Sequence, residues 1–401
     1  MIHRFDTIVL GLGAIGSAAI YQLAKRGHKV LGIDQFSPPH NYGSSHGETR
    51  IIRQAIGEGE EYMPLVLRSY ELWREIENEV GNELLTITGG LTLESQNSEA
   101  VMHGRRNFLD QAVSCAKKFN IRHEILETQE IQKRYPQFSV TNERGYFEYE
   151  TGFLRPELCV DAQLQLAQTK GAIVQTGEKA TSIVPQENSG VCVQTDHSVY
   201  AAESLIVTAG PWISEFLPAS YRGFFKVYRQ VMYWFNIKEE FRLTFLPGRF
   251  PIFIWIFGKG REFGFYGFPT LNGKTIKMAS EQFAVVTVPD EVDRAVTRTE
   301  EKAMYKNYIM GRIPGLSDVC SEAVSCLYTT TPDSNFMIDF HPENNRIVVA
   351  SPCSGHGFKH SAAIGEVLSD LVIDGKSKID ISSFSMKRFN ISSNSSAREE
   401  Q

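Results

Sequence analysis

Three glycines with the spacing Gly11-Leu12-Gly13-Ala14-Ile15-Gly16 carry the clearest chemical signal in the chain. The apolar run 7–10 precedes them and a helical pattern follows, so they stand at a turn from strand to helix. In such a turn the first glycine permits the tight bend, the second lets the backbone approach a pyrophosphate, and the third lets helix and strand pack closely. The helix N-terminus adds free N–H groups and a positive dipole end. We therefore predict a dinucleotide-binding site.

An acidic side chain stands where that kind of site needs one. The second apolar run, 30–33, ends on Asp34, roughly 20 residues after the glycines, where an acid accepts hydrogen bonds from a ribose. The motif does not separate NAD from FAD. The alternative is a glycine-rich turn between strand and helix that binds no ligand.

Two arginines lie in the polar, glycine-rich passage 37–59 that follows. This passage leaves the nucleotide unit at the carboxyl edge of its strands, where ligands of open α/β sheets bind. Arg50 and Arg53 are three residues apart, so they share a face if the segment is helical. On chemistry alone they are either cations for a ligand or two solvated side chains.

The totals restrict the class of protein. A chain of 401 residues with a net charge of −6 and no basic block is expected to have two or three domains and to bind neither nucleic acid nor an anionic membrane. No apolar run approaches the roughly 20 residues of a membrane span. The first predicted strand begins close to Met1, so we expect no signal peptide. The six cysteines lack metal-ligand spacing, which favours reduced thiols in the cytoplasm and no metal site.

The elements that must position these residues follow from periodicity and turn signals. We predict helices over 62–80, near 99–119 and over 128–135, with Thr128 as the N-cap of the last, and another from Arg155-Pro156 to about 170. Short strands are expected at 172–176, 182–184, 191–194 and 198–201. The apolar run 204–207 is interpreted as a return to the nucleotide sheet.

Aromatic, alternating runs dominate 226–328 and predict an antiparallel sheet with one face along a pocket, interrupted by a helix near 299–310. The last segment returns to a buried strand at 347–350, a turn at 351–358 and a helix at 359–374. The tail from Ser392 is expected to be disordered. The fold class is therefore α/β with two domains: a discontinuous Rossmann-like domain and an antiparallel-sheet domain inserted between its parts.

Six short motifs in the same order resemble the monomeric sarcosine oxidase and N-methyltryptophan oxidase family of flavoproteins, and the likeness runs from Phe5 to about Ser385. They are Gly11-Leu12-Gly13-Ala14-Ile15-Gly16; His46-Gly47-Glu48-Thr49-Arg50-Ile51-Ile52-Arg53; Tyr228-Arg229-Gln230-Val231; Tyr266-Gly267-Phe268-Pro269; Cys326-Leu327-Tyr328-Thr329; and Ser354-Gly355-His356-Gly357-Phe358-Lys359.

The resemblance implies FAD attached by a thioether to Cys326, which without it would be interpreted as a buried structural thiol. It implies an FAD-binding domain made of 1–85, 150–222 and 332–385, a substrate domain made of 86–149 and 223–331, and a tail at 386–401. The motif positions implied to contact the cofactor are Gly11, Gly13, Ala14, Ile15, Gly16, Asp34, Ser44, His46, Thr49, Arg50, Cys326, Gly355, Gly357, Phe358 and Lys359.

The resemblance also assigns residues to the substrate. Arg53 and Lys359 match a carboxylate clamp, for which arginine and lysine have the right charge. Tyr266 and Tyr328 match pocket tyrosines beside the amine, Gly355 matches a backbone position close to the substrate, and Thr49 and Arg50 match positions packed on the flavin.

Lys277 matches a lysine that activates O₂, because a fixed ammonium stabilises the negative charge that develops on dioxygen. The alternative is a surface lysine between Ile276 and Met278.

One position departs from the family pattern. Counting forward from Lys277 without a gap, the active-site histidine of the family falls on Glu281. An acid there changes the local charge and favours a substrate with an extra cation, unless the register has slipped. No other histidine lies between Met278 and Thr299 to take the role.

The implied function is a flavin-dependent oxidase of secondary amino acids, N-methylated or cyclic, that releases hydrogen peroxide, with a monomer as the expected state. Three alternatives stay open: an amine dehydrogenase with another electron acceptor, an NAD-dependent dehydrogenase, and a catalytically silent flavin-binding protein. Lys277 argues against the first, Cys326 and Lys359 argue against the second, and Glu281 keeps the third open.

Overall fold

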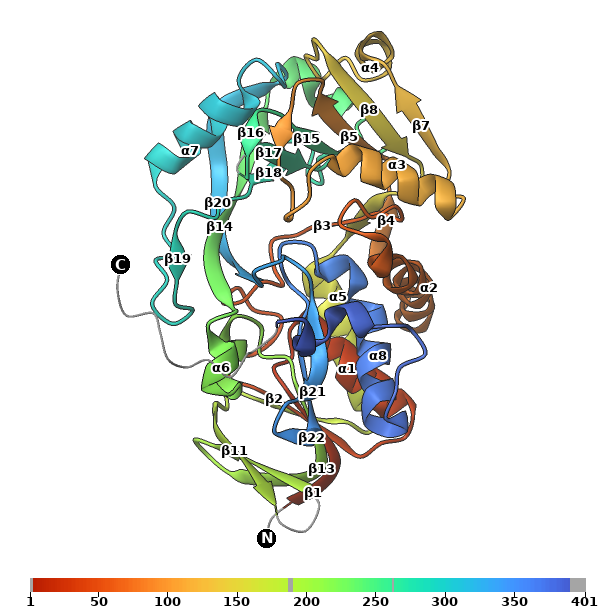
Figure 1. The fold of residues 1–401 in the computed structure, drawn as a ribbon. Helices are drawn as coiled ribbons and strands as arrows, with labels where there is room; N and C mark the ends of the chain where they lie inside the picture. Colours follow the sequence, from red (N-terminus) through yellow and green to blue (C-terminus); the bar gives the residue numbers. More distant parts are fainter. Residues whose placement is uncertain (1–2, 187–189, 262, 390–401) are drawn as a thin grey trace, which may run out of the picture.

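The computed structural model describes residues 3–186, 190–261 and 263–389, so the expected disorder from Ser392 onward lies outside the described residues. Two large sheets organise the fold (Figure 1). One has eight strands and lies beside the helices α1, α5 and α8; the other has nine strands and forms the opposite end of the molecule in Figure 1. The strand and helix types therefore agree with an α/β fold.

The eight-stranded sheet has a parallel centre in the order β10-β2-β1-β13, with β22 parallel to the end of β13. These strands are β1 (His3–Leu10), β2 (Val30–Asp34), β10 (Ile173–Thr176), β13 (Val199–Val207) and β22 (Asn344–Ser351). The predicted return to this sheet is confirmed, because Leu205 to Val207 pair with Ile8 to Leu10. The predicted strands 198–201 and 204–207 are one continuous strand.

Helices α1 (Ala14–Lys25), α5 (Pro156–Thr169) and α8 (Ser361–Asp374) pack together against the sheet and share one apolar core with α2 (Met63–Val80). Antiparallel strands complete the sheet: β11 (Ala180–Gln186), β12 (Gly190–Thr195) and β21 (Met337–His341). Gly365 of α8 lies so close to Ala18 of α1 that a Cβ there would stand 2.5 Å from the Ala18 Cβ. This close packing holds the N-terminus of α1 in place.

The nine-stranded sheet has the order β19-β14-β18-β17-β15-β5-β8-β7, with β20 also paired to β14. Its neighbours are antiparallel except β15 and β5. The strands are β5 (Gly90–Ser95), β7 (His123–Leu126), β8 (Glu143–Glu148), β14 (Lys226–Ile237), β15 (Ile252–Ile256), β17 (Gly264–Gly267), β18 (Thr275–Ser280), β19 (Val286–Thr287) and β20 (Leu316–Thr330).

Side chains alternate across this sheet as the period of a strand requires. Val231, Tyr233 and Phe235 of β14 join one apolar core with Ile276 and Met278 of β18. The side chains between them face the other way, and Met232 and Trp234 cluster there with Cys326 and Tyr328 of β20. Of this second face, Tyr328 lines the large cavity described below, together with Tyr266 of β17.

A three-stranded sheet lies between the two large sheets and comprises β3 (Arg50–Ile52), β4 (Leu85–Ile87) and β9 (Gly152–Leu154). Because 50–52 is a strand, the helical condition under which Arg50 and Arg53 would share a face is not met. Other elements include β16 (Lys259–Gly260), α6 (Ala219–Arg222) and α7 (Arg298–Met304), the last continued by a π-helical turn to Ile309. Among the residues described, no helix has the length and hydropathy needed to cross a bilayer.

One predicted helix begins later than expected, and another begins at the predicted residue but has a different N-cap. The segment 99–107 contains a short strand, β6 (Glu99–Ala100), and a turn, so α3 starts only at Phe108 and runs to Lys118. Positive φ angles at His103 and Asn107 explain why the helix cannot start earlier. Thr128 does not cap α4 (Thr128–Arg134); Glu127 takes that position, and the Thr128 hydroxyl donates to the Glu143 carbonyl at 2.7 Å.

Candidate active site

The turn from β1 to α1 has the geometry that its glycines predicted. Gly11 has φ +87°, and a Cβ there would lie 2.6 Å from the Thr208 carbonyl oxygen, while a Cβ on Gly16 would lie 1.7 Å from the Gly11 carbonyl oxygen. A Cβ on Gly13 would meet only the Ser45 hydroxyl, at 3.4 Å. Glycine is therefore needed for packing at the first and third positions and leaves the second open to a ligand.

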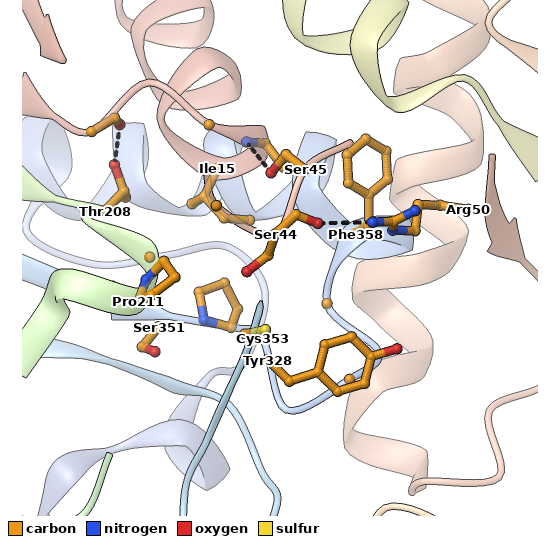
Figure 2. Close-up of a pocket in the computed structure, with 18 of the residues that line it drawn as sticks. Ile15, Ser44, Ser45, Arg50, Thr208, Pro211, Tyr328, Ser351, Cys353 and Phe358 are labelled. Atoms are coloured by element: carbon orange, nitrogen blue, oxygen red, sulfur yellow. Dashed lines mark hydrogen bonds between the residues drawn. The ribbon is translucent and has the colours of Figure 1, made fainter. Parts of the chain in front are cut away.

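The first turn of α1 carries no acidic residue and its N-cap residue makes no side-chain cap bond. Ala14 N–H donates to Ser45 Oγ at 3.1 Å, and Thr208 Oγ1 donates to the Gly11 carbonyl (Figure 2). Asp34 lies beside this turn, where its two oxygens accept N–H bonds from Leu12 at 2.7 Å and Phe36 at 2.8 Å. An open helix N-terminus next to a fixed carboxylate fits the pyrophosphate and ribose of a dinucleotide.

One large cavity joins this turn to the nine-stranded sheet. The predicted site residues that line it are Gly11, Gly13, Ala14, Ile15, Asp34, Ser44, Arg50, Arg53, Tyr266, Glu281, Tyr328, Gly355, Gly357, Phe358 and Lys359. Gly16, His46, Thr49, Lys277 and Cys326 are not part of its lining in the described chain. The site predicted from separate motifs is thus largely assembled around one cavity.

Cys326 lies on β20 two residues before Tyr328, so the two side chains share a face of the strand. Its thiol is free and buried, and burial raises its pKa, against the opposing effect of Arg50 and Lys277. Tyr328 and a second cysteine, Cys353, reach the cavity wall (Figure 2). Burial likewise raises the pKa of the neighbouring Tyr266 to about 12.

Arg53 and Lys359 are both buried and both contact one carboxylate, that of Glu58. Arg53 Nη2 donates to the two Glu58 oxygens at 2.8 and 2.6 Å, and Lys359 Nζ lies 3.6 Å from Glu58 Oε1. Burial opposes the charged form of Glu58, but Arg53 and Lys359 outweigh it and hold its pKa well below the usual value. Burial lowers the pKa of Lys359 to about 8, with Glu58 opposing and Arg53 adding to the shift.

His103 connects that carboxylate to Glu281. Its Nδ1 lies 3.0 Å from Glu58 Oε1 and its Nε2 lies 2.8 Å from Glu281 Oε1. Burial favours the neutral ring, but Glu281 and Glu58 outweigh it and raise the pKa of His103 to about 9. Gly355, with φ +86°, faces the same pair, since a Cβ there would lie 3.0 Å from His103 Nε2 and 3.1 Å from Glu281 Oε1.

Lys277 is buried on β18 and lines a separate small recess together with Thr49, Glu48, Trp234 and Phe268. Its Nζ donates to the carbonyl of Gly47 and to the carbonyl and hydroxyl of Thr49, the last two at 2.7 and 3.2 Å. Burial lowers its pKa well below the usual value, and Arg50 adds to the shift. Lys277 therefore lies behind the wall of the large cavity, on the side of Thr49.

The remaining predicted residues close the same region. Arg50 donates to the Ser44 carbonyl at 3.0 Å (Figure 2) and to the Thr49 carbonyl at 2.9 Å. His46 is buried, and burial together with Arg50 lowers its pKa to about 3, so its ring is neutral. Phe358 begins the short turn of helix that carries Lys359.

Sequence reasoning missed two residues of this site, Glu58 and His103. Glu58 lies in the polar passage that carries Arg53, and the need of a buried cation for a counter-charge was a signal that could have identified it. His103 lies in a segment predicted to be helical and is 178 residues from Glu281, so no local pattern relates them. The sequence near Glu281 contains no histidine between Met278 and Thr299, but the fold brings His103 beside Glu281 from a distant segment.

Comparisons with known proteins agree with this architecture. A model of the FAD dependent oxidoreductase family, DAO, matches residues 6–371. The chain is 38% identical to the monomeric sarcosine oxidase of Bacillus sp. (strain B-0618) over 391 residues, 97% of each chain. It is 34% identical to the N-methyl-L-tryptophan oxidase of Yersinia pestis (strain Pestoides F) over 387 residues, 96% of this chain and 99% of the relative. The solved structure of NikD, described as an unusual amino acid oxidase, superposes with a TM-score of 0.80 at 21% identity, covering 96% of this chain and 97% of that one, which shows a shared fold.

Proposed function

The chain belongs to the family of FAD-dependent oxidoreductases, and from this premise we propose that it oxidises secondary amino acids, N-methylated or cyclic, at the carbon next to nitrogen. The observation that carries the proposal is that two buried cations, Arg53 and Lys359, share a cavity with an open dinucleotide cradle. A free carboxylate on the substrate matches those cations. The names of the relatives, a sarcosine oxidase and an N-methyl-L-tryptophan oxidase, support a secondary amine.

In this proposal the substrate carboxylate lies on Arg53 and Lys359 and shares them with Glu58. Arginine and lysine orient it through charge-assisted hydrogen bonds. Tyr328, which is buried, and Tyr266, which is partly buried, line the cavity on the sheet side, where they exclude water around the amine and restrict its position. Gly355 leaves the space into which the substrate fits, because any side chain there would contact Tyr328 and His103.

FAD, when bound, supplies the redox chemistry, accepting a hydride equivalent from the substrate and passing electrons to O₂ to give hydrogen peroxide. Gly11, Gly13, Ala14, Ile15 and Gly16 would hold its pyrophosphate and Asp34 a ribose. Ser44, His46, Thr49, Arg50, Gly357 and Phe358 would surround the remainder. Lys277 would stabilise the negative charge that develops on dioxygen.

Cys326 is proposed to attach the cofactor through a thioether. Its support is the motif match and its position on the site face of β20, two residues from Tyr328. We further propose that the FAD-binding domain comprises 1–85, 150–222 and 332–385, and that the substrate domain comprises 86–149 and 223–331. A monomer in the cytoplasm is proposed from the printed name of a relative and from the free thiols of Cys115, Cys159, Cys320, Cys326 and Cys353.

The experiment that tests the function is a substrate panel. Sarcosine, N-methyl-L-tryptophan, L-proline and L-pipecolate are added to the purified holoenzyme, first without oxygen and then with it. At least one should bleach the flavin absorbance anaerobically and yield about one peroxide per amine in air. Bleaching without peroxide would indicate a dehydrogenase with another acceptor, and no bleaching with any amine would contradict the proposal.

Acid precipitation of the same holoenzyme tests the attachment. A yellow pellet is expected for the wild type and a colourless pellet for Cys326→Ala, whereas a colourless wild-type pellet would remove the thioether from the proposal. The Cys353→Ala variant is the matched control, because Cys353 reaches the cavity but lies outside the motif.

A further inference from the structure

Glu281 has one carboxylate oxygen fixed and one without a partner. Its side chain is 8% exposed and lines the large cavity. Oε1 lies 2.8 Å from His103 Nε2, whereas Oε2 has no hydrogen-bond partner among the described residues. A buried acceptor left unpaired costs free energy, and a buried charged one costs more. An unpaired carboxylate oxygen in a cavity wall therefore indicates a ligand that donates to it.

The contacts of His103 explain why this oxygen keeps its place. Glu58 and Glu281 are both acceptors, so the ring fills its position best when both nitrogens carry hydrogen. The raised pKa of His103 agrees with that state. A positively charged ring between two carboxylates holds Glu281 at a fixed distance from Glu58, which in turn contacts Arg53 and Lys359. The cations Arg53 and Lys359 and the carboxylate of Glu281 are thus connected through Glu58 and His103.

We propose that Glu281 Oε2 binds the protonated amine of the substrate while the substrate carboxylate lies on Arg53 and Lys359. This inference rests on the proposed function and names the form of its substrate: an α-amino acid whose secondary amine arrives charged. The spacing favours the α-amine, because one imidazole ring separates the two glutamates and one carbon separates the two charged groups of an α-amino acid. An ammonium at the end of a long side chain would lie several bonds further away.

The same contact gives the amine proton a destination. Oxidation at the carbon next to nitrogen requires the neutral amine, so one N–H bond of the ammonium must break. In the proposed arrangement the proton forms an O–H bond with Glu281 Oε2, the ammonium becomes a neutral amine, and no electron is transferred in this step. Glu281 is then a proton acceptor as well as a binding group.

The test compares ligands that differ in one atom. Methoxyacetate is sarcosine with an ether oxygen in place of the charged NH₂ group. Tetrahydrofuran-2-carboxylate has the same relation to L-proline. Their affinities are measured by calorimetry on holoenzyme that has been chemically reduced under argon, so that no ligand turns over. Glu281→Gln should weaken the amines about 10- to 100-fold, as expected for loss of a charged hydrogen bond, and change the ethers less than about threefold.

A second variant and a control complete the design. Glu281→His also removes the negative charge and should give the same pattern, so a folding defect in one variant does not decide the result. Arg53→Met should weaken amines and ethers alike. The inference is overturned if the glutamate variants leave the amines unchanged or weaken both members of a pair equally. If the wild type binds none of the four ligands, the same comparison is made with the amine that bleaches the flavin in the substrate panel and with its ether analogue. If no amine of that panel binds or bleaches the flavin, the proposed function itself fails.

Discussion

Two lysines of the site are buried to the same extent, yet their surroundings differ. Lys359 is 5% exposed and Lys277 is 4% exposed. Lys359 Nζ lies 3.6 Å from the Glu58 carboxylate and donates to the His356 carbonyl at 2.7 Å. The hydrogen bonds of Lys277 go to uncharged oxygens of Gly47 and Thr49, and its ammonium lies 4.8 Å from the centre of the Phe268 ring.

The difference shows how the same residue type is suited to two tasks. Burial lowers the pKa of both lysines, but Glu58 opposes the shift at Lys359, which keeps a pKa of about 8. Lys359 already holds an internal carboxylate, so an incoming carboxylate meets a charged and oriented partner. Among the described residues Lys277 makes no ion pair, and the charges of Glu157 and Glu48 oppose the effect of burial on its pKa without overcoming it. Its pKa would rise if a further negative charge developed beside it. We infer a binding role for the first and a response to transient charge for the second.

The comparison is tested most strongly by removing the Lys277 ammonium. Lys277→Met should slow reoxidation of the reduced flavin by O₂ about 10²–10³-fold, the usual loss when one preorganised electrostatic donor is deleted. Anaerobic reduction by substrate should change little, because Lys277 lies outside the lining of the large cavity. Stopped-flow absorbance measures both half-reactions separately.

Lys359→Met is the matched control and should behave in the opposite way. It should raise the substrate concentration needed for half-maximal flavin reduction and leave reoxidation close to the wild-type rate. If either variant slowed both half-reactions to the same degree, the two lysines would not have separate tasks.

The features of the site that depend on neighbours in the chain could be predicted from the sequence. The glycines 11–16 and Asp34 are close in the chain, and their spacing reflects local contacts that a short motif records. The alternation on β14 and β18 likewise follows from the period of a strand, which is why Lys277 is separated from the core residues Ile276 and Met278. Local geometry is visible in sequence because neighbours in the chain create it.

The network around Glu281 could not be predicted in this way. Its three members, Glu58, His103 and Glu281, come from separate segments, and His103 is 45 residues from one partner and 178 from the other. His103 also has a positive φ in a segment where hydrophobic spacing suggested a helix. Tertiary packing overrides such weak local preferences. The departure at Glu281 was visible, but its compensation by His103 was not.

The pH dependence of carboxylate binding sharpens the comparison further. Lys359 has a pKa of about 8 in the free protein, so its ammonium is present below that pH and is lost as the pH rises through it. The affinity for methoxyacetate should therefore be constant below about pH 8 and fall by up to about tenfold per pH unit above it. The profile of Lys277→Met should break at the same pH, and that of Lys359→Met should be flat in this range. A break that persists in Lys359→Met would assign the titration to another group.

The smallest expected effect concerns Gly355, on the Lys359 side of the site. Gly355→Ala places a Cβ 3.0 Å from His103 Nε2 and Tyr328 Cε2, at a φ of +86° that costs about 1–2 kcal/mol for a residue with a side chain. Anaerobic flavin reduction should slow by about tenfold, and reoxidation should keep its rate. Gly375→Ala is the matched control, because Gly375 has φ +70° but no atom within 4 Å of its Cβ position. Gly375→Ala should lose similar stability in thermal unfolding without a change in the rate of either half-reaction. Slower flavin reduction in Gly355→Ala alone would locate the amine between Gly355, Tyr328 and Glu281. Equal slowing in both variants would mean that backbone strain alone causes the effect.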